Sequence, residues 1–187
     1  NGYKEIFFTQ TDLDGTGKGG IFAFSHDANE LYDIDDNPNT LSGFANIGAN
    51  VKSTPSIADI DSDGKFEILV TTVDCKDNNP AESKTFVYKI FDSDNDNNPD
   101  LLWTFNSKQC IHGVIIAPFK NQTNSLELFS TKTWNDDNDK FSIINNNGTI
   151  YREILIDGSN DQYEGVSSMA AISDIDNDGN LEIVVGY

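Results

Sequence analysis

Residues 56–70 read Ser56-Ile-Ala-Asp-Ile-Asp-Ser-Asp-Gly-Lys-Phe-Glu-Ile-Leu-Val70, and residues 171–185 repeat them closely as Ala171-Ile-Ser-Asp-Ile-Asp-Asn-Asp-Gly-Asn-Leu-Glu-Ile-Val-Val185. Both copies place Asp-x-Asp-x-Asp-Gly-x-x-Glu between two short apolar runs. Short apolar runs joined by an acidic, glycine-containing loop are typical of two neighbouring strands. The sequence therefore predicts a strand–loop–strand unit that is used more than once.

A repeat extends beyond these two copies. The glutamates that open the apolar runs are Glu5, Glu67, Glu127 and Glu182, which are 62, 60 and 55 residues apart. A period of this size is typical of a repeat architecture. Between the glutamates, short segments rich in Val, Ile, Phe and Tyr are bounded by Asn, Asp and Gly, which favours strands and turns over helices.

Two complete repeats each predict four antiparallel strands. In one they cover 56–60, 66–73, 85–91 and 101–105, and in the next 113–119, 126–133, 140–145 and 151–155. Four such strands per repeat suggest a propeller blade. The predicted fold is therefore all-β, with about three blades' worth of chain. Its segments are a partial blade at 1–50, blades at 51–110 and 111–160, and a partial blade at 161–187. Since both ends fall inside a repeat, we expect part of a larger propeller, closed by further chain or by further copies.

The duplicated loop has the spacing of a calcium site. Ca²⁺ takes about six to eight oxygen ligands, and loop positions 1, 3, 5, 7 (through its carbonyl) and 9 can surround it. The predicted ligands of the first copy are Asp59, Asp61, Asp63, Lys65 and Glu67, and those of the second are Asp174, Asp176, Asp178, Asn180 and Glu182. The alternative is an Asx-rich turn without metal. Against it, three carboxylates in one loop repel one another unless a cation is present.

Other loops match the spacing less well. One further candidate is the set Asp92, Asp94, Asp96, Asn98 and Asp100, which could hold calcium or form a solvated acidic turn. Asn1 and Glu5 stand at positions 5 and 9 of the same pattern. The corresponding loop of the third repeat, residues 120–125, has no acidic residue, so no calcium is expected there.

Residues 54–68 and 173–187 resemble the FG-GAP/VCBS repeat family, which includes the propeller repeats of integrin α-subunit heads. Segments 19–24 and 86–90 and the pair Leu102-Trp103 are similar to its later strands. The resemblance implies a β-propeller that carries calcium in the first hairpin loop of its blades.

Composition narrows the classes of partner. The chain has 187 residues with 12 Lys and Arg against 31 Asp and Glu, a net charge of −19. Such a surface repels nucleic acid and anionic membranes and suits cations or cationic partners. No apolar run approaches the roughly 18 residues of a membrane-spanning helix.

The two cysteines and the N-glycosylation patterns bear on the cellular compartment of the protein. Cys75 follows the second strand and Cys110 the fourth strand of the same repeat, so a disulfide between them is plausible; two free thiols are the alternative. A disulfide fits an oxidising, extracellular compartment. Asn121 and Asn147 match the N-glycosylation pattern and matter only in a eukaryotic source. We expect a secreted or cell-surface protein.

No catalytic constellation stands out around the two histidines, His26 and His112. We therefore expect a calcium-binding extracellular β-propeller scaffold for adhesion or for binding a protein or carbohydrate ligand, and not an enzyme. Two alternatives stay open. The repeats are also similar to those of polysaccharide lyases that act on rhamnogalacturonan, and an open arc of blades would suit a structural subunit of an extracellular assembly or filament.

Overall fold

The computed structural model describes residues 4–11, 19–31, 43–47, 49–51, 53–72, 83–94, 99–107, 110–118, 127–133, 140–155 and 170–184. Within these ranges the regular structure is entirely β, in thirteen strands without a helix. The expected all-β class is confirmed. None of the described residues belongs to a helix with the length and apolarity to cross a membrane.

The strands form four antiparallel sheets, each built from strands that are consecutive in the chain. Sheet one contains β1 (Ile6–Gln10), β2 (Gly20–Phe24) and β3 (Ala45–Asn46). Sheet two contains β4 (Ser56–Ala58), β5 (Glu67–Thr71), β6 (Ser83–Lys89) and β7 (Leu101–Ser107). Sheet three contains β8 (Cys110–Ala117), β9 (Glu127–Thr133), β10 (Lys140–Ile144) and β11 (Ile150–Leu155). Sheet four contains β12 (Ala171–Ser173) and β13 (Glu182–Val184).

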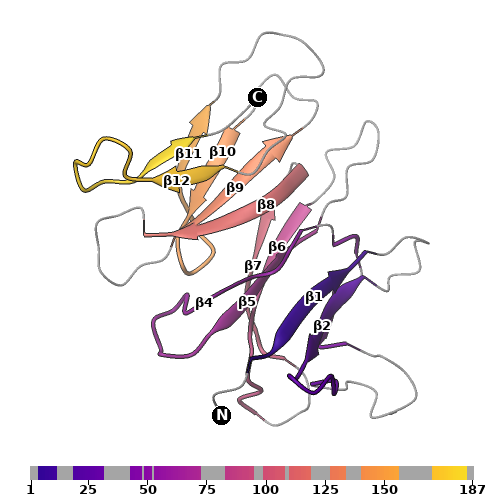
Figure 1. Ribbon diagram of the computed structural model, residues 1–187. Helices are drawn as coiled ribbons and strands as arrows, with labels where there is room; N and C mark the ends of the chain where they lie inside the picture. The colour runs from indigo at the N-terminus through magenta and orange to yellow at the C-terminus, as the bar shows by residue number, and fades with distance from the viewer. Residues whose placement is uncertain are drawn as a thin grey trace.

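Successive sheets pack face to face in chain order, with sheet two between sheets one and three (Figure 1). Because side chains alternate along a strand, each sheet has two faces. We call the face towards the preceding sheet the N-side face and the face towards the following sheet the C-side face. In β5, Ile68 and Val70 lie on the N-side face and join the core with sheet one. Leu69, between them, lies on the C-side face and joins the core with sheet three.

This two-sided burial explains why β5 is apolar at consecutive positions and not at alternate ones. All five of its residues are buried. A strand that is covered on one face only needs apolar residues at every second position, whereas a strand covered on both faces needs them throughout. The core between sheets one and two is filled by Phe44, whose ring lies edge-on to Phe7 at 5.9 Å and to Tyr88 at 6.4 Å between centroids.

A polar contact also joins sheets two and three. The Trp103 Nε1–H of β7 donates to the Asn146 carbonyl, 2.7 Å away, in the turn between β10 and β11. Gly148 in that turn has φ of +79°, and a Cβ there would lie 2.8 Å from the Trp103 ring. Glycine is needed at this position both for the left-handed conformation and for the close approach of the indole.

Candidate metal centre

The two acidic loops, 59–67 between β4 and β5 and 174–182 between β12 and β13, share one backbone conformation. Gly64 and Gly179 have φ of +86° and +89° at the sharp turn. Ser62 and Asn177, two residues earlier, have φ of +61° and +60°. The loops therefore have the same shape although they lie in different sheets.

The same hydrogen bonds hold both loops. In the first, Gly64 N–H donates to Asp59 Oδ2 at 3.1 Å and Asp63 N–H to Asp61 Oδ1 at 3.1 Å. Ile60 N–H donates to Glu67 Oε2 at 2.7 Å. The corresponding distances in the second loop are 3.0, 3.1 and 2.7 Å. In the first loop each of these bonds uses one oxygen of its carboxylate. In the second loop Asp178 N–H also donates to Asp174 Oδ1 at 3.1 Å, so that both oxygens of Asp174 accept backbone amides.

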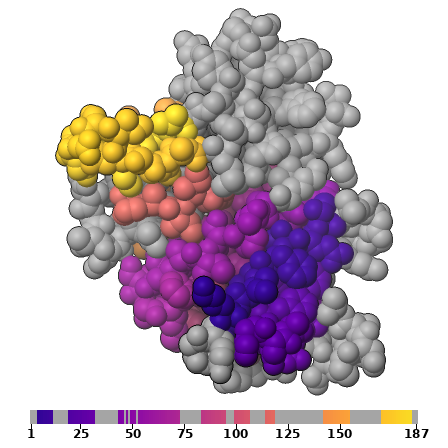
Figure 2. All heavy atoms as spheres, viewed as in Figure 1, coloured from indigo at the N-terminus to yellow at the C-terminus, as the bar shows by residue number. Residues whose placement is uncertain are grey.

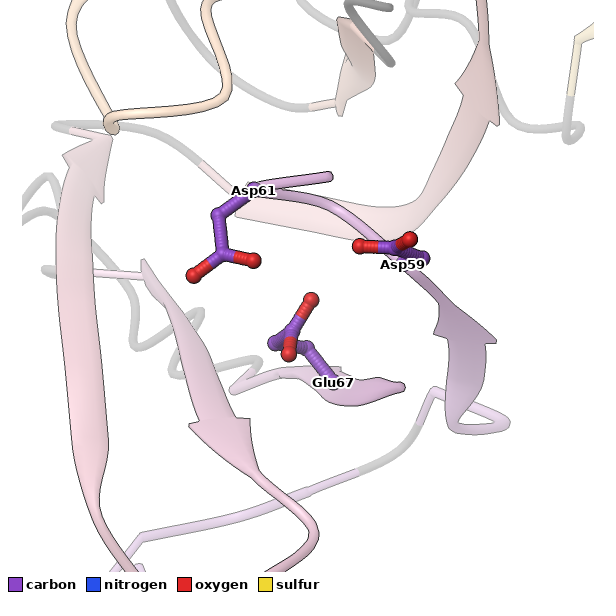
Figure 3. Close-up of side chains that lie close together, drawn as sticks. All are labelled: Asp59, Asp61 and Glu67. Atoms are coloured by element: carbon purple, nitrogen blue, oxygen red, sulfur yellow. The ribbon is translucent and has the colours of Figure 1, made fainter. Parts of the chain in front are cut away.

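Three carboxylates converge in the first loop. One oxygen each of Asp59, Asp61 and Glu67 lies within 4.8 Å of the others. Figure 3 shows the three side chains pointing towards a common point, Asp59 and Asp61 from the loop and Glu67 from the start of β5. In the second loop Asp174, Asp176 and Glu182 are gathered in the same way. Both groups could hold a metal ion.

The first group is partly buried, and Glu67 is its most deeply buried member. Glu67 is 0% exposed. Its Oε1 and the Asp59 Oδ1 are buried oxygens without a hydrogen-bond partner. Burial raises the pKa of Glu67, and the charges of Asp61 and Asp63 raise it further, against the lowering effect of the Ile60 amide. Oxygens of this kind fit a bound cation, because a buried carboxylate needs a compensating charge or donor.

The remaining predicted side-chain ligand, Asp63, lies outside the converging group. Its Oδ1 accepts from Lys65 N–H at 2.8 Å, and its Oδ2 lies 3.4 Å from Lys89 Nζ. Lys89, at the end of β6, also lies 3.7 Å from Asp61 Oδ2. Desolvation lowers the pKa of Lys89, but the Asp63 hydrogen bond and the nearby carboxylates outweigh it and leave the pKa raised. A lysine from the neighbouring hairpin thus supplies positive charge to this loop.

The second loop differs at the equivalent residue. Asp178 accepts from Asn180 through the backbone amide at 2.7 Å and through the side-chain amide at 2.9 Å. These bonds lower the pKa of Asp178, the backbone bond most strongly. The Lys65 and Asn180 carbonyls stay predicted ligands.

A third group lies in the turn between β6 and β7. Asp92, Asp94 and Asp100 converge within 4.8 Å of one another. Ser93 donates to Asp100 through its amide at 3.0 Å and through its hydroxyl. Asp96 and Asn98 lie outside the described residues. This turn adjoins the first loop, since Lys65 Nζ lies 3.5 Å from the centroid of the Phe91 ring.

Sequence reasoning missed Lys89 and Ser93. Lys89 is the residue paired with Glu67 in the β5–β6 register, so strand pairing could have revealed it. No comparable pattern in the sequence indicated that the Ser93 hydroxyl would contact the acidic group.

The other predicted sites are described only in part. β8 begins at Cys110, so this residue opens sheet three and does not follow the fourth strand of sheet two as a loop residue. Cys75 and Asn121 lie outside the described residues, and the disulfide stays a prediction. Asn147 is exposed in the β10–β11 turn, where its Oδ1 accepts from the Thr149 amide at 3.1 Å and hydroxyl at 2.7 Å.

Comparison of the chain with protein-family models, with curated proteins and with solved structures finds no match.

Proposed function

We propose that this chain is a calcium-stabilised segment of a β-propeller scaffold of the FG-GAP/VCBS type. In this proposal it works at the cell surface or in a secreted protein, in adhesion or in binding a protein or carbohydrate ligand. The observation that carries the metal assignment is the pair of buried, unpartnered oxygens, Asp59 Oδ1 and Glu67 Oε1. They belong to two of three carboxylates that converge on one point.

The buried carboxylate oxygens of the first loop favour a bound cation. An unpaired carboxylate in a protein interior costs several kcal/mol, roughly, unless a cation or donors compensate it. In the first loop Lys89 contacts Asp61 and Asp63, while the two orphaned oxygens belong to Asp59 and Glu67. A divalent cation among Asp59, Asp61 and Glu67 would satisfy both and remove their mutual repulsion.

The donor set favours calcium among the metals. All the converging ligands are carboxylate oxygens, which hard cations prefer to the nitrogen and sulfur donors that zinc and copper take. Ca²⁺ accepts many oxygens in flexible geometry, whereas Mg²⁺ demands a near-ideal octahedron and retains water. A loop that wraps its ligands around one point fits the larger ion better.

The position of the loops supports the proposed scaffold role. Each one closes the hairpin between the first two strands described in its sheet, and loop 59–67 is packed against the next sheet through Ile60. An ion there would stabilise the hairpin and the packing of its sheet. Long loops on such a framework are the usual place for ligand binding.

Thermal unfolding with and without calcium tests the proposal. Occupancy at about 100 times the dissociation constant stabilises a folded protein by about 2.7 kcal/mol, which is about 5–10 °C in Tm at this size. Calcium should raise Tm relative to EDTA, and magnesium should raise it much less. Glu67→Gln and Asp61→Asn should each reduce the gain, while Glu5→Gln, the exposed glutamate at the same register position of sheet one, should not. A Tm that is equal in calcium and EDTA would refute the metal assignment.

A further inference from the structure

In sheets one, two and four, equivalent positions of the strand that follows the glutamate face the neighbouring sheet. The glutamates Glu5, Glu67 and Glu182 align the strands that follow them. On this alignment Ile6 and Phe8 correspond to Ile68 and Val70, which lie on the N-side face of sheet two. The next residue along, Phe7, corresponds to Leu69, and both lie on C-side faces packed against the following sheet. Each interface thus joins the C-side face of one sheet to the N-side face of the next.

The N-side face of sheet one carries this apolar pattern at two exposed positions. Ile6 is 60% and Phe8 43% exposed, whereas Ile68 and Val70 are 0% exposed. The Phe8 ring stacks on Phe22 at 5.3 Å and on Phe24 at 5.7 Å between centroids, nearly parallel in both cases. Phe22 is itself only 7% exposed, so Ile6 and Phe8 provide the apolar surface that this face exposes.

The C-side face of sheet four also has two exposed apolar positions. Ile175 is 58% and Val184 50% exposed. The residues that correspond to them in sheet two, Ile60 and Leu69, are 0% and 2% exposed because sheet three packs on them. The interface between successive sheets pairs a C-side face with an N-side face. The chain therefore exposes an N-side face at sheet one and a C-side face at sheet four.

We propose that these two faces form a heterologous interface, in which the C-side face of sheet four in one copy packs on the N-side face of sheet one in a second copy. The contact would continue, between molecules, the packing that joins sheets one to two, two to three and three to four within the chain. Figure 2 shows β1 (indigo) and the β12–β13 hairpin (yellow) in separate regions of the surface, so one copy does not bring its own two faces together. Head-to-tail contacts of this kind yield a ring if the rotation closes and a filament if it does not.

Net charge sets the conditions for this assembly. Two copies at −19 each repel one another, and the repulsion is screened by salt. Apolar packing is not weakened by screening. Association should therefore strengthen as the salt concentration rises, unlike association through ion pairs. The inference does not depend on the metal, because the four exposed side chains are apolar.

Sedimentation velocity and light scattering on the chain in calcium and moderate salt provide the test. The wild type should form oligomers that grow with protein concentration. Phe8→Asp removes the N-side half and Val184→Asp removes the C-side half, so each variant alone should be monomeric. Ile150→Asp, in which a comparably exposed residue of β11 changes outside both faces, should assemble like the wild type. Ile6→Asp serves as a second N-side variant if Phe8→Asp unfolds, as judged by thermal melting.

Mixing the two monomeric variants is the decisive step. Phe8→Asp keeps an intact C-side face and Val184→Asp keeps an intact N-side face, so an equimolar mixture should give a heterodimer that grows no further. A wild type that stays monomeric at every accessible concentration, because other chain or another partner covers these faces, would overturn the proposal. So would variants that still self-associate, or a mixture that does not pair.

Discussion

Loops 59–67 and 174–182 differ in their surroundings and hardly at all in themselves. They share their sequence pattern, their positive φ values and the hydrogen bonds from backbone amides to their carboxylates. Yet Ile60 is buried in the first and its counterpart Ile175 is exposed in the second. The local sequence therefore determines the conformation of the loop, and the neighbouring sheet determines its burial.

Burial in turn determines whether the carboxylates need a compensating charge. In the first loop, buried Glu67 has a raised pKa and an unpartnered oxygen. In the second loop Glu182 is only partly buried. The first loop thus holds a buried glutamate that needs a compensating charge, whereas the equivalent glutamate of the second loop is partly exposed. The following predictions test this difference.

The largest expected effect comes from the core residue. Ile60→Ala should lower the free energy of unfolding by about 2–5 kcal/mol, because it removes a buried side chain and leaves a cavity. The matched change Ile175→Ala should cost within about 0.5 kcal/mol, as expected for an exposed position. Urea unfolding of both variants at a low protein concentration measures the two costs. Equal costs would show that burial does not distinguish the loops.

The next effect concerns pH in the metal-free protein. Burial raises the folded pKa of Glu67 above its ordinary value of 4.5, so the folded state holds this proton more tightly than the unfolded state does. Glu67 therefore lowers the free energy of unfolding as pH rises from about 4.5 through the raised pKa. Glu67→Gln should remove this contribution, and its EDTA-treated form should be more stable than the wild type at neutral pH.

Denaturation curves of Glu67→Gln and the wild type across this pH range measure how the difference in their free energy of unfolding changes with pH. The stability difference between Glu67→Gln and the wild type should grow with pH in this window. Asp178, whose pKa is lowered, acts in the opposite direction in both proteins and cancels in the difference. A difference that is flat with pH would mean that Glu67 is not desolvated.

A smaller effect tests the backbone conformation that the two loops share. Gly64→Ala and Gly179→Ala should each cost about 1–2 kcal/mol, because alanine is strained at positive φ. At neither position would an added Cβ meet an atom within 4 Å, so the two costs should be similar. Gly148→Ala should cost more, since its Cβ would also collide with Trp103. Thermal melts of the three variants give this ranking directly.

The smallest expected effect belongs to Lys89. Lys89→Gln should change the stability of the metal-free protein by less than about 1 kcal/mol, as is usual for partly exposed ion pairs. It should also strengthen calcium binding at the first loop, because a competing positive charge beside Asp61 and Asp63 is gone. Binding at the second loop should stay unchanged. Weaker binding at the first loop would contradict this reading of Lys89.

The sequence predicted the strands and the loops well, because both depend on local patterns. The strand expected at 56–60 is β4, that at 101–105 lies within β7, and the carboxylates of Asp59, Asp61 and Glu67 converge as their spacing suggests. Local patterns could not distinguish Ile60 from Ile175, whose flanking residues are identical.

What escaped prediction lies in contacts between segments far apart in the chain. The Trp103 indole reaches the Asn146 carbonyl in another sheet, and Lys89 reaches Asp63 across a hairpin. Such contacts depend on how sheets stack, and a repeat period does not specify which faces are covered. For the same reason the exposed faces of sheets one and four became apparent only from the packing.

Isothermal titration with calcium tests the central claim most directly. The wild type, first stripped with EDTA, should bind calcium, and Glu67→Gln and Glu182→Gln should each bind one ion fewer. The double variant should lose both, and Glu5→Gln should match the wild type. If the heats of the wild type and the double variant are the same, the two acidic loops are not the calcium sites and the account is wrong.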